Sequence, residues 1–342
     1  MDNFISNDNI KIFIITHIIL LGCIFFIVYF KDKISVYLKI MDFPDNHIKI
    51  HQLPIPRLGG LIILFYILPA LLINYHITSD ELKNLIITLS LCIVFFSIGL
   101  IDDRKTLSAT NKSLTLLIML LFIIPLSDEL IIKQINFKNL DFSINLLHTS
   151  IFFTIFSIFA LYNAYNFSDG VNGVAAALGI FWIIFVIIKS ENYTNLYYQA
   201  ILISLIIILY FNMKRKLFLG NSGTNLFSIA ISLILIKEYK NNNLYCDEIF
   251  FILFLPGIDM IRLSMQRIIS GNSPFLGDNQ HLHHLLRIVI KERFIFFVYI
   301  IFGITPIIIY NFFINNFYTV FALSIALYLV IFFLLHRLQR NL

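Results

Sequence analysis

Long apolar runs recur along almost the whole chain, and this pattern restricts the folds open to it. A helix of about 20 apolar residues crosses a hydrocarbon layer about 30 Å thick, and about eleven runs approach that length or fall a few residues short of it. They occupy residues 10–30, 58–76, 84–101, 113–126, 148–162, 174–189, 195–211, 224–236, 247–261, 294–311 and 316–336. The chain is 59% hydrophobic and only 13% charged, whereas soluble proteins carry roughly 25% charged residues. We therefore expect an all-α polytopic membrane protein with about 11 transmembrane helices, forming a single transmembrane domain over residues 1–342.

The basic residues predict the orientation of these spans. The run 10–30 follows Asp2 and Asp8 rather than a basic segment, so we expect an uncleaved first span with the amino terminus outside. The segments then expected in the cytoplasm are 31–57, 102–112, 163–173, 212–223, 262–293 and 337–342. They contain every arginine and most of the lysines, as the positive-inside rule requires. On the outer side, the mixed polarity of residues 127–147 predicts a small β-hairpin.

Asp102 and Asp103 close the third apolar run, at a depth where carboxylates are costly unless they meet cations or water. Adjacent carboxylates at a membrane edge suit a divalent metal, a phosphate-handling site or a proton acceptor. A solvated helix end is the alternative. Arg104 and Lys112 follow closely, which favours a site of mixed charge.

The segment NAYNFSDGVNG, residues 163–173, is rich in hard oxygen ligands. If it is helical, Asn163 and Asn166 share one face, and the glycines after Asp169 and Asn172 allow the backbone to approach a ligand closely. Amide and carboxylate oxygens suit Mg²⁺. A capping turn explains Asp169 and Gly170 alone, but not the whole string.

In FLGNSG, residues 218–223, the small residues predict a turn entering the eighth apolar run. Ser222 and backbone amides at a helix start can face a phosphate. Helix capping by Asn221 is the alternative, and this motif alone does not distinguish the two.

The segment GDNQHLHH brings together His281, His283 and His284. These histidines suit zinc ligation, hydrogen bonding to phosphate or proton shuttling, and a surface histidine run is the alternative. No cysteine accompanies them, which disfavours zinc. Lys49 and Arg57 add basic residues to the same expected face, where a solvated basic loop is the simpler interpretation.

Together, carboxylates, amides, histidines and cations on one membrane face suit a diphosphate-bearing soluble substrate that meets a lipid-borne acceptor. The clusters resemble, in order and in wording, the polyprenyl-phosphate N-acetylhexosamine-1-phosphate transferase family, glycosyltransferase family 4. The matching pieces run from about residue 44 to 284: PDNHIKIHQLPIPRLGG, GLIDDRKTLSATNK, NAYNFSDGVNG, FLGNSG and DMIRLSMQRIISGNSPFLGDNQHLHH. The HLHH form is similar to the WecA-type branch more than to the related MraY-type enzymes.

The resemblance implies an enzyme of the bacterial inner membrane with its active site in the cytoplasm. It would transfer a sugar 1-phosphate from a UDP-sugar to undecaprenyl phosphate, release UMP, and so start a lipid-linked glycan such as O-antigen. It would require Mg²⁺, with Mn²⁺ as an alternative. No nucleic-acid partner is expected; the UDP-sugar, the pathway, a homodimer, and direct attack against a covalent intermediate all stay open.

The resemblance also assigns roles to residues. Asp102, Asp103 and Asp169 would be catalytic, the first two handling the lipid phosphate, and Asn166 and Asn221 would lie at the metal. The substrate-binding positions would be Lys49, Arg57, Arg104, Lys112, Asn163, Asn172, His281, His283 and His284. Where the family usually has an aspartate, this chain has Asn221, which keeps an oxygen ligand but removes a negative charge. Weaker Mg²⁺ binding is therefore expected.

Two alternatives stay open. Asn221 suggests a catalytically weakened relative that binds nucleotide or lipid without efficient turnover. The other is an ion-coupled transporter with a carboxylate inside the membrane. Asp259, beside the interruption at Pro256 and Gly257, is the candidate for that role.

Overall fold

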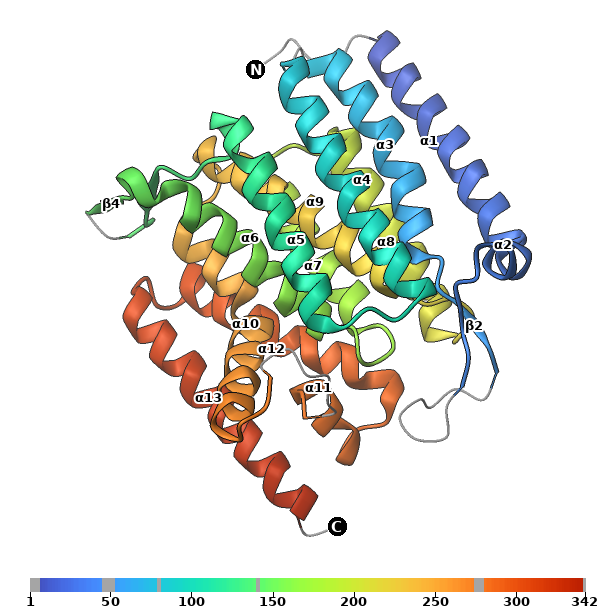
Figure 1. Ribbon diagram of the computed structural model, residues 1–342. Helices are drawn as coiled ribbons and strands as arrows, with labels where there is room; N and C mark the ends of the chain where they lie inside the picture. Colours follow the sequence, from blue (N-terminus) through green and yellow to red (C-terminus); the bar gives the residue numbers. More distant parts are fainter. Residues whose placement is uncertain (1–6, 45–52, 79–80, 140–141, 274–279, 341–342) are drawn as a thin grey trace.

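The protein is a bundle of helices that run mostly along one direction, with a small β-hairpin at one end (Figure 1). The computed structural model describes residues 7–44, 53–78, 81–139, 142–273 and 280–340. The helices are α1 (Asn7–Tyr29), α2 (Lys31–Leu38), α3 (Gly59–Thr78), α4 (Leu82–Arg104), α5 (Ala109–Ile123), α6 (Ser150–Phe167), α7 (Val174–Ser190), α8 (Leu196–Met213), α9 (Gly220–Lys240), α10 (Cys246–Ile269), α11 (Leu282–Leu285), α12 (Glu292–Phe312) and α13 (Phe317–Arg340). The short strands are β1 (Met41–Asp42), β2 (Ile55–Pro56), β3 (Gln134–Asn136) and β4 (Ser143–Asn145).

Each of the eleven apolar runs corresponds to a helix, so the expectation of a helical membrane protein is confirmed. Within the described residues, seven helices are long and apolar enough to cross a membrane, or eight if the bent pair α1 and α2 forms one span. These two helices meet at 72°. Helix α7 is apolar but shorter. Eleven crossings and an outside amino terminus stay predictions.

The centre of the bundle is α9, which packs against α3, α4, α6 and α7. Buried small and polar residues of α9, including Ser222, Asn225 and Ser228, let its neighbours approach closely. A Cβ at Gly99 of α4 would lie 2.4 Å from the Asn221 carbonyl oxygen, and one at Gly60 of α3 would lie 2.5 Å from Ser222 Oγ. Glycine at these two positions therefore allows three helices to converge where α9 begins.

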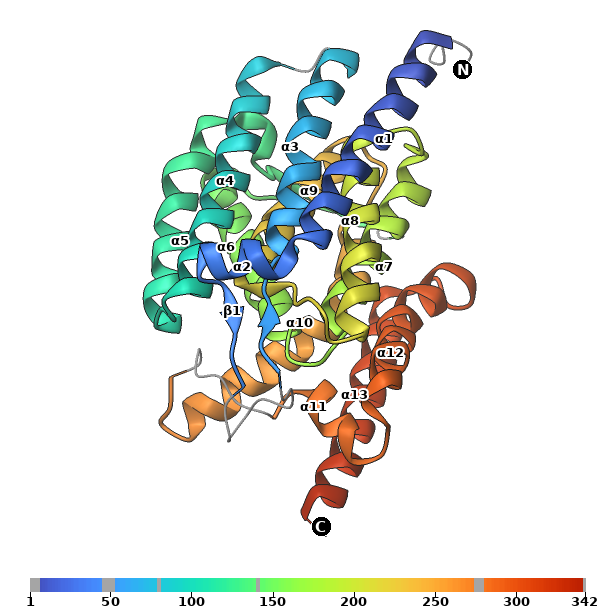
Figure 2. The ribbon, with the colours of Figure 1, turned by 90° about the vertical axis from the view of Figure 1, so that its right-hand side faces the viewer.

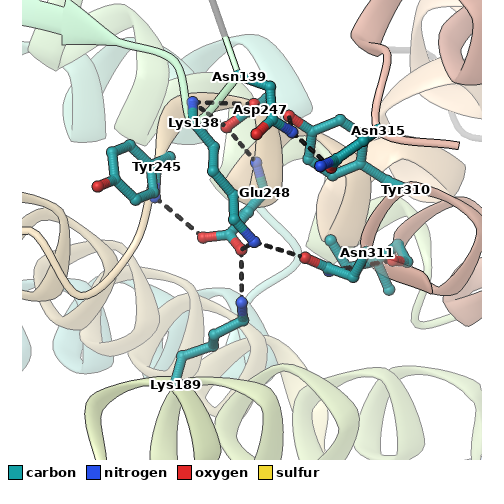
Figure 3. Close-up of polar contacts among 10 residues, drawn as sticks. Lys138, Asn139, Lys189, Tyr245, Asp247, Glu248, Tyr310, Asn311 and Asn315 are labelled. Carbon is teal, nitrogen blue, oxygen red and sulfur yellow. Dashed lines mark hydrogen bonds and ion pairs between the residues drawn. The ribbon is translucent and has the colours of Figure 1, made fainter.

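The predicted hairpin is present: β3 and β4 pair antiparallel, with Ile135 opposite Ile144. A network of polar side chains ties this hairpin to the helices beside it (Figure 3). Asp247 accepts hydrogen bonds from the Lys138 backbone and from the Tyr310 hydroxyl. Glu248 forms ion pairs with Lys138, at 3.2 Å, and Lys189, at 2.5 Å. Both carboxylates are buried.

The carboxyl-terminal helices form one side of the molecule (Figure 2). There, α12 packs against both α10 and α13. The buried residues of this region, among them Leu255, Tyr299 and Tyr328, form an apolar cluster that also includes Val171 and Leu282. The short helix α11 packs against α12 and α13. This packing holds the histidine segment beside the loop between α6 and α7.

Candidate active site

Asp103 joins the end of α4 to the beginning of α9. Its carboxylate accepts hydrogen bonds from the backbone N–H groups of Asn221, at 2.8 Å, and Ser222, at 2.9 Å, and from Ser222 Oγ at 2.8 Å. The amino terminus of a helix presents unpaired N–H groups and a partial positive charge. Buried Asp103 thus satisfies these donors, and both of its oxygens are engaged by α9.

Gly220 makes this arrangement sterically possible. Its φ of +72° lies in the left-handed region, and an added Cβ would stand 2.9 Å from Asp103 Oδ2. A side chain here would be both strained and in conflict with the carboxylate. The turn predicted from FLGNSG is therefore confirmed, but its backbone amides and Ser222 hydroxyl face Asp103, and a contact with phosphate stays a prediction.

Lys112 connects the Asp102 carboxylate to the Asn221 side chain at the beginning of α9. Its ammonium lies 3.0 Å from Asp102 Oδ2 and donates to Asn221 Oδ1 at 2.9 Å. Ser108 caps α5, accepting from the Asn111 N–H, so Lys112 stands in the first turn of that helix. The other Asp102 oxygen accepts from the Leu107 N–H at 2.7 Å. Lys112 is thus shared by a carboxylate and an amide.

Arg57 brings a second cation from the strand pair β1 and β2. Its guanidinium binds Asp42 of β1 and lies 3.8 Å from Asp103 Oδ1. The antiparallel pairing of Asp42 with Ile55 sets this position. Asp42 was not singled out in the sequence, although its place just before the PDN motif is a signal. Lys49 lies outside the described residues.

Asn166 and Asp169 reach the same place from the end of α6. Asn166 Oδ1 accepts a hydrogen bond from Thr224 Oγ1 of α9 at 3.3 Å. Asp169 is exposed to solvent but stands among protein groups. Desolvation by those groups, and then the negative charge of Asp103, raise the pKa of Asp169 to about 7, against the opposing effect of Arg57 and Lys112. Asp169 therefore shares one electrostatic environment with Asp103 and both cations.

The histidines lie next to this group because Gly170 has no side chain. A Cβ at Gly170 would be 2.5 Å from His284 Nε2 and 2.6 Å from His283 Nε2. The residue after Asp169 is thus in direct proximity to the histidine segment. Two motifs more than 100 positions apart in the sequence form one site.

His281 is held by a buried polar cluster. Its Nδ1 lies 2.9 Å from Asp259 Oδ2, and Asp259 also accepts from Arg262, at 2.9 Å, and from Tyr328, at 2.7 Å. These contacts join α10 and α13 to the histidine segment. Neither Asp259 nor Arg262 was assigned a role in this site from the sequence, and only tertiary packing shows the link.

His283 is fully buried between the other two imidazoles. Its ring centroid lies 5.4 Å from that of His281 and 4.5 Å from that of His284. Burial, and then the neighbouring histidines, lower the pKa of His283 well below its usual value, so the ring is neutral. Within the described part of the chain, neither of its nitrogens has a hydrogen-bond partner.

Three other predicted substrate-binding residues, Asn163, Asn172 and Arg104, have different surroundings. Asn163 is buried and donates to the Phe159 carbonyl of its own helix at 2.8 Å. Asn172 donates at 2.7 Å to Glu292, which also binds Arg215. Arg104 is exposed at the end of α4. These hydrogen bonds do not join the side chains to Asp103, and the substrate-binding roles of all three residues stay predictions.

The chemistry of the donors fits a hard divalent cation. Asp169, Asn166 and Asn221 offer carboxylate and amide oxygens of the kind that Mg²⁺ prefers. One of them is already engaged, because Asn221 Oδ1 accepts from Lys112. Over the residues that the structure describes, no group of three or more His, Cys, Asp or Glu side chains is arranged to hold a metal. These three candidate ligands therefore comprise one carboxylate and two amides.

Fold and site together define a polytopic helical membrane protein in which carboxylates, cations and histidines meet at one end of the bundle. Residues 85–238 match the family model described as glycosyl transferase family 4. The chain is similar to the undecaprenyl-phosphate alpha-N-acetylglucosaminyl 1-phosphate transferases of Pasteurella multocida, 31% identical over 75% of this chain and 74% of the relative, and Haemophilus influenzae, 29% identical over 73% and 72%. The Escherichia coli K12 protein of the same name is 24% identical over 82% of this chain and 76% of its own length. The chain belongs to this family and is a sugar-1-phosphate transferase.

Proposed function

We propose that the protein transfers an N-acetylhexosamine 1-phosphate from a UDP-sugar to undecaprenyl phosphate and releases UMP at the cytoplasmic face of a bacterial inner membrane. The observation that carries this proposal is the junction of Asp103, Lys112 and Arg57 with Asp169 and the histidines. That junction combines groups for two phosphate-bearing substrates at the end of a membrane bundle. The names of the relatives support the lipid acceptor and the sugar.

In the proposed reaction, an oxygen of the lipid phosphate attacks the β-phosphorus of the UDP-sugar. The bond from that phosphorus to the UMP oxygen breaks, and UMP leaves with the electron pair. Little covalent chemistry is required of the protein, so positioning and neutralisation of charge supply most of the catalysis. Arg57 and Lys112 are the cations placed to neutralise the phosphates.

Asp103 is proposed as a positioning residue. Both of its oxygens hold the beginning of α9, and so they fix Asn221, Ser222 and the facing Lys112. Asp102 holds Lys112 from the other side. Because these oxygens already accept hydrogen bonds, we propose direct attack by the lipid phosphate rather than a covalent intermediate on either aspartate.

Asp169 and Asn166 are the residues proposed to hold Mg²⁺, or alternatively Mn²⁺. The bound cation would neutralise diphosphate oxygens and stabilise the departing UMP. Asn221 faces the same place, but its oxygen serves Lys112. Buried, neutral His283, with His281 fixed by Asp259, is proposed to donate a hydrogen bond to the sugar nucleotide.

The test uses the purified full chain in detergent with undecaprenyl phosphate, Mg²⁺ and a panel of UDP-N-acetylhexosamines. We expect UMP and a lipid-linked sugar diphosphate to form with at least one donor. Omission of the lipid controls for hydrolysis. A panel in which no donor releases UMP above that control would contradict the proposal.

A second candidate function, a weakened relative that binds substrates without efficient turnover, is favoured by one observation: Lys112 occupies the oxygen of Asn221. Asn221→Asp separates the two. A large gain in rate or in Mg²⁺ affinity would support the weakened relative, whereas a loss would mean that the site works with asparagine.

The transporter alternative loses its main support. Asp259 accepts hydrogen bonds or ion pairs from His281, Arg262 and Tyr328. A carboxylate in such a network serves packing between helices. We therefore do not propose ion transport for this chain.

A further inference from the structure

A polar cavity of about 490 Å³ lies at the end of the bundle opposite to Asp103. Residues near the ends of α3 and α9 and near the beginnings of α4 and α8 enclose it, together with the segment around Leu130. Helix α9 starts at the active site and ends here; 21 residues, at 1.5 Å each, separate the two by roughly 30 Å. The cavity is thus distinct from the proposed transferase site.

The charge on the lining is mainly positive. Lys237 and Lys240, one turn apart on α9, both line the cavity, and Glu129 is the one carboxylate among the described lining residues. Lys240 Nζ donates to the Asp128 carbonyl at 2.9 Å, which holds the ammonium in place. A cavity with two cations and one anion favours a negatively charged ligand.

The remaining polar lining is suited to hydroxyl groups. Asn74 and Asn84 line the cavity together with Tyr198. An amide side chain offers both a donor and an acceptor, as a hydroxyl does. Asn84 Oδ1 accepts from Ser127 Oγ at 2.8 Å, which fixes the orientation of that amide. The cavity lies within the size range of small-molecule sites and greatly exceeds the space that one water needs.

Apolar side chains complete the wall and relate the cavity to the membrane. Leu71 and Leu85 line it from α3 and α4, and α3, α4 and α8 are candidate membrane spans. The ends of spanning helices lie near the boundary between hydrocarbon and water. A ligand held here therefore meets both polar groups and an apolar wall.

We propose that this cavity binds a phosphate ester of a polyol, with the phosphate at Lys237 and Lys240 and the hydroxyls at the asparagine amides. Two sources share this chemistry. One is the headgroup of a phosphatidylglycerol-type lipid, whose chains would follow the apolar wall. The other is a soluble ester such as glycerol 3-phosphate. Neither source is a substrate of the proposed transferase reaction, so this site does not depend on that proposal.

The experiment measures dissociation constants for the purified full chain in detergent. The probes are glycerol 3-phosphate, inorganic phosphate, and short-chain phosphatidylglycerol and phosphatidylcholine. The double variant Lys237→Gln, Lys240→Gln should bind the preferred phosphate ester at least about tenfold more weakly, because it removes both cations proposed to bind the phosphate. Lys83→Gln, an exposed lysine outside the cavity lining, is the matched control and should bind normally.

The probes separate the sources. Lysine-dependent binding of phosphatidylglycerol without glycerol 3-phosphate binding identifies the lipid, and lysine-dependent binding of glycerol 3-phosphate identifies headgroup chemistry as sufficient. Equal affinity for phosphatidylglycerol and phosphatidylcholine, binding of inorganic phosphate alone, or binding unaffected in the double variant would overturn the proposal. If the double variant does not fold, Asn84→Asp, which adds a negative charge to the lining, should also weaken binding; unchanged affinity there would equally overturn it.

Discussion

Two pairs of adjacent carboxylates lie at opposite ends of the bundle, and their surroundings differ. Asp247 and Glu248, at the start of α10, are buried and receive the donors of Tyr310, Lys138 and Lys189 (Figure 3). Asp102 and Asp103, at the end of α4, are also buried and paired. Their neighbourhood, however, includes exposed Asp169 and a histidine ring without a partner among the described residues.

Burial and pairing alone therefore do not distinguish the pair that joins packed elements from the pair at the proposed active site. At Asp247 and Glu248, the partners come from the hairpin, α7 and α12, and the contacts hold these elements together. At Asp102 and Asp103, the partners hold the beginning of α9, and polar groups beside them stay accessible. Function depends on the groups that the network leaves for a ligand.

The largest expected effect on turnover is that of Asp103→Asn. The amide removes the negative charge and places a donor against the N–H groups of Asn221 and Ser222, so the beginning of α9 must shift. We expect kcat/KM for UMP release to fall at least 100-fold, about 2.7 kcal/mol. Asp128→Asn, at the exposed opposite end, should stay within twofold. An unchanged rate in Asp103→Asn would show that the Asp103 carboxylate does not contribute to turnover.

The next effect is a pH dependence at Asp169. Its pKa is raised to about 7, so at limiting Mg²⁺ the carboxylate is protonated below that pH, and we expect the rate to fall about tenfold per pH unit. A raised carboxyl pKa also means that ionisation destabilises the folded state: the cost is absent below the unfolded value and complete above pH 7.

Two controls sharpen this prediction. Saturating Mg²⁺ should shift the pH at which the rate falls (the acidic limb of the pH profile) to a lower value, because the cation competes with the proton for the Asp169 carboxylate. Asp169→Asn should be slow and should lack the limb. A limb near pH 7 that persists in Asp169→Asn would assign the titration to another group.

A smaller effect is expected from Gly170→Ala. The new methyl group would lie 2.5–2.6 Å from His284 and His283, so the rings must move away from Asp169. We expect kcat/KM to fall about tenfold, mainly through KM for the UDP-sugar. Gly257→Ala is the control, because a Cβ there meets nothing within 4 Å and the helix gains stability. Equal kinetics in the two variants would separate Gly170 from the substrate site.

Glu248→Gln should have the smallest effect on turnover and a large one on stability. It leaves Lys138 and Lys189 without their buried anion, and because both lysines are partly exposed, we expect a cost of about 1–3 kcal/mol, as for lost hydrogen bonds to a charged group. Thermal unfolding should shift downward while kcat/KM per folded molecule stays within twofold. Glu191→Gln, at an exposed position, is the control. A large loss of turnover with unchanged melting would erase the difference between the two carboxylate pairs.

Much of the fold could be predicted because apolar runs and turn signals are local. The eleven runs are helices, residues 127–147 contain the hairpin, and Gly220 has the backbone that its turn requires. Site assignments were less complete. Asn163 and Asn172 fit the pattern of ligands, and their roles stay predictions; that their amides donate to Phe159 and Glu292 could not be predicted, since the direction of an amide depends on its packing.

The sequence by itself determined a helical membrane protein, its family, and the polar segments that form its site, because membrane burial and motif spacing are written along the chain. Only the tertiary structure decided that Asp103 holds the beginning of α9, that Gly170 places Asp169 beside the histidines, and that Asp247 and Glu248 are structural. It also revealed the cavity at Lys237 and Lys240. These features depend on contacts between residues far apart in sequence, and close packing of α9 with its neighbours sets them.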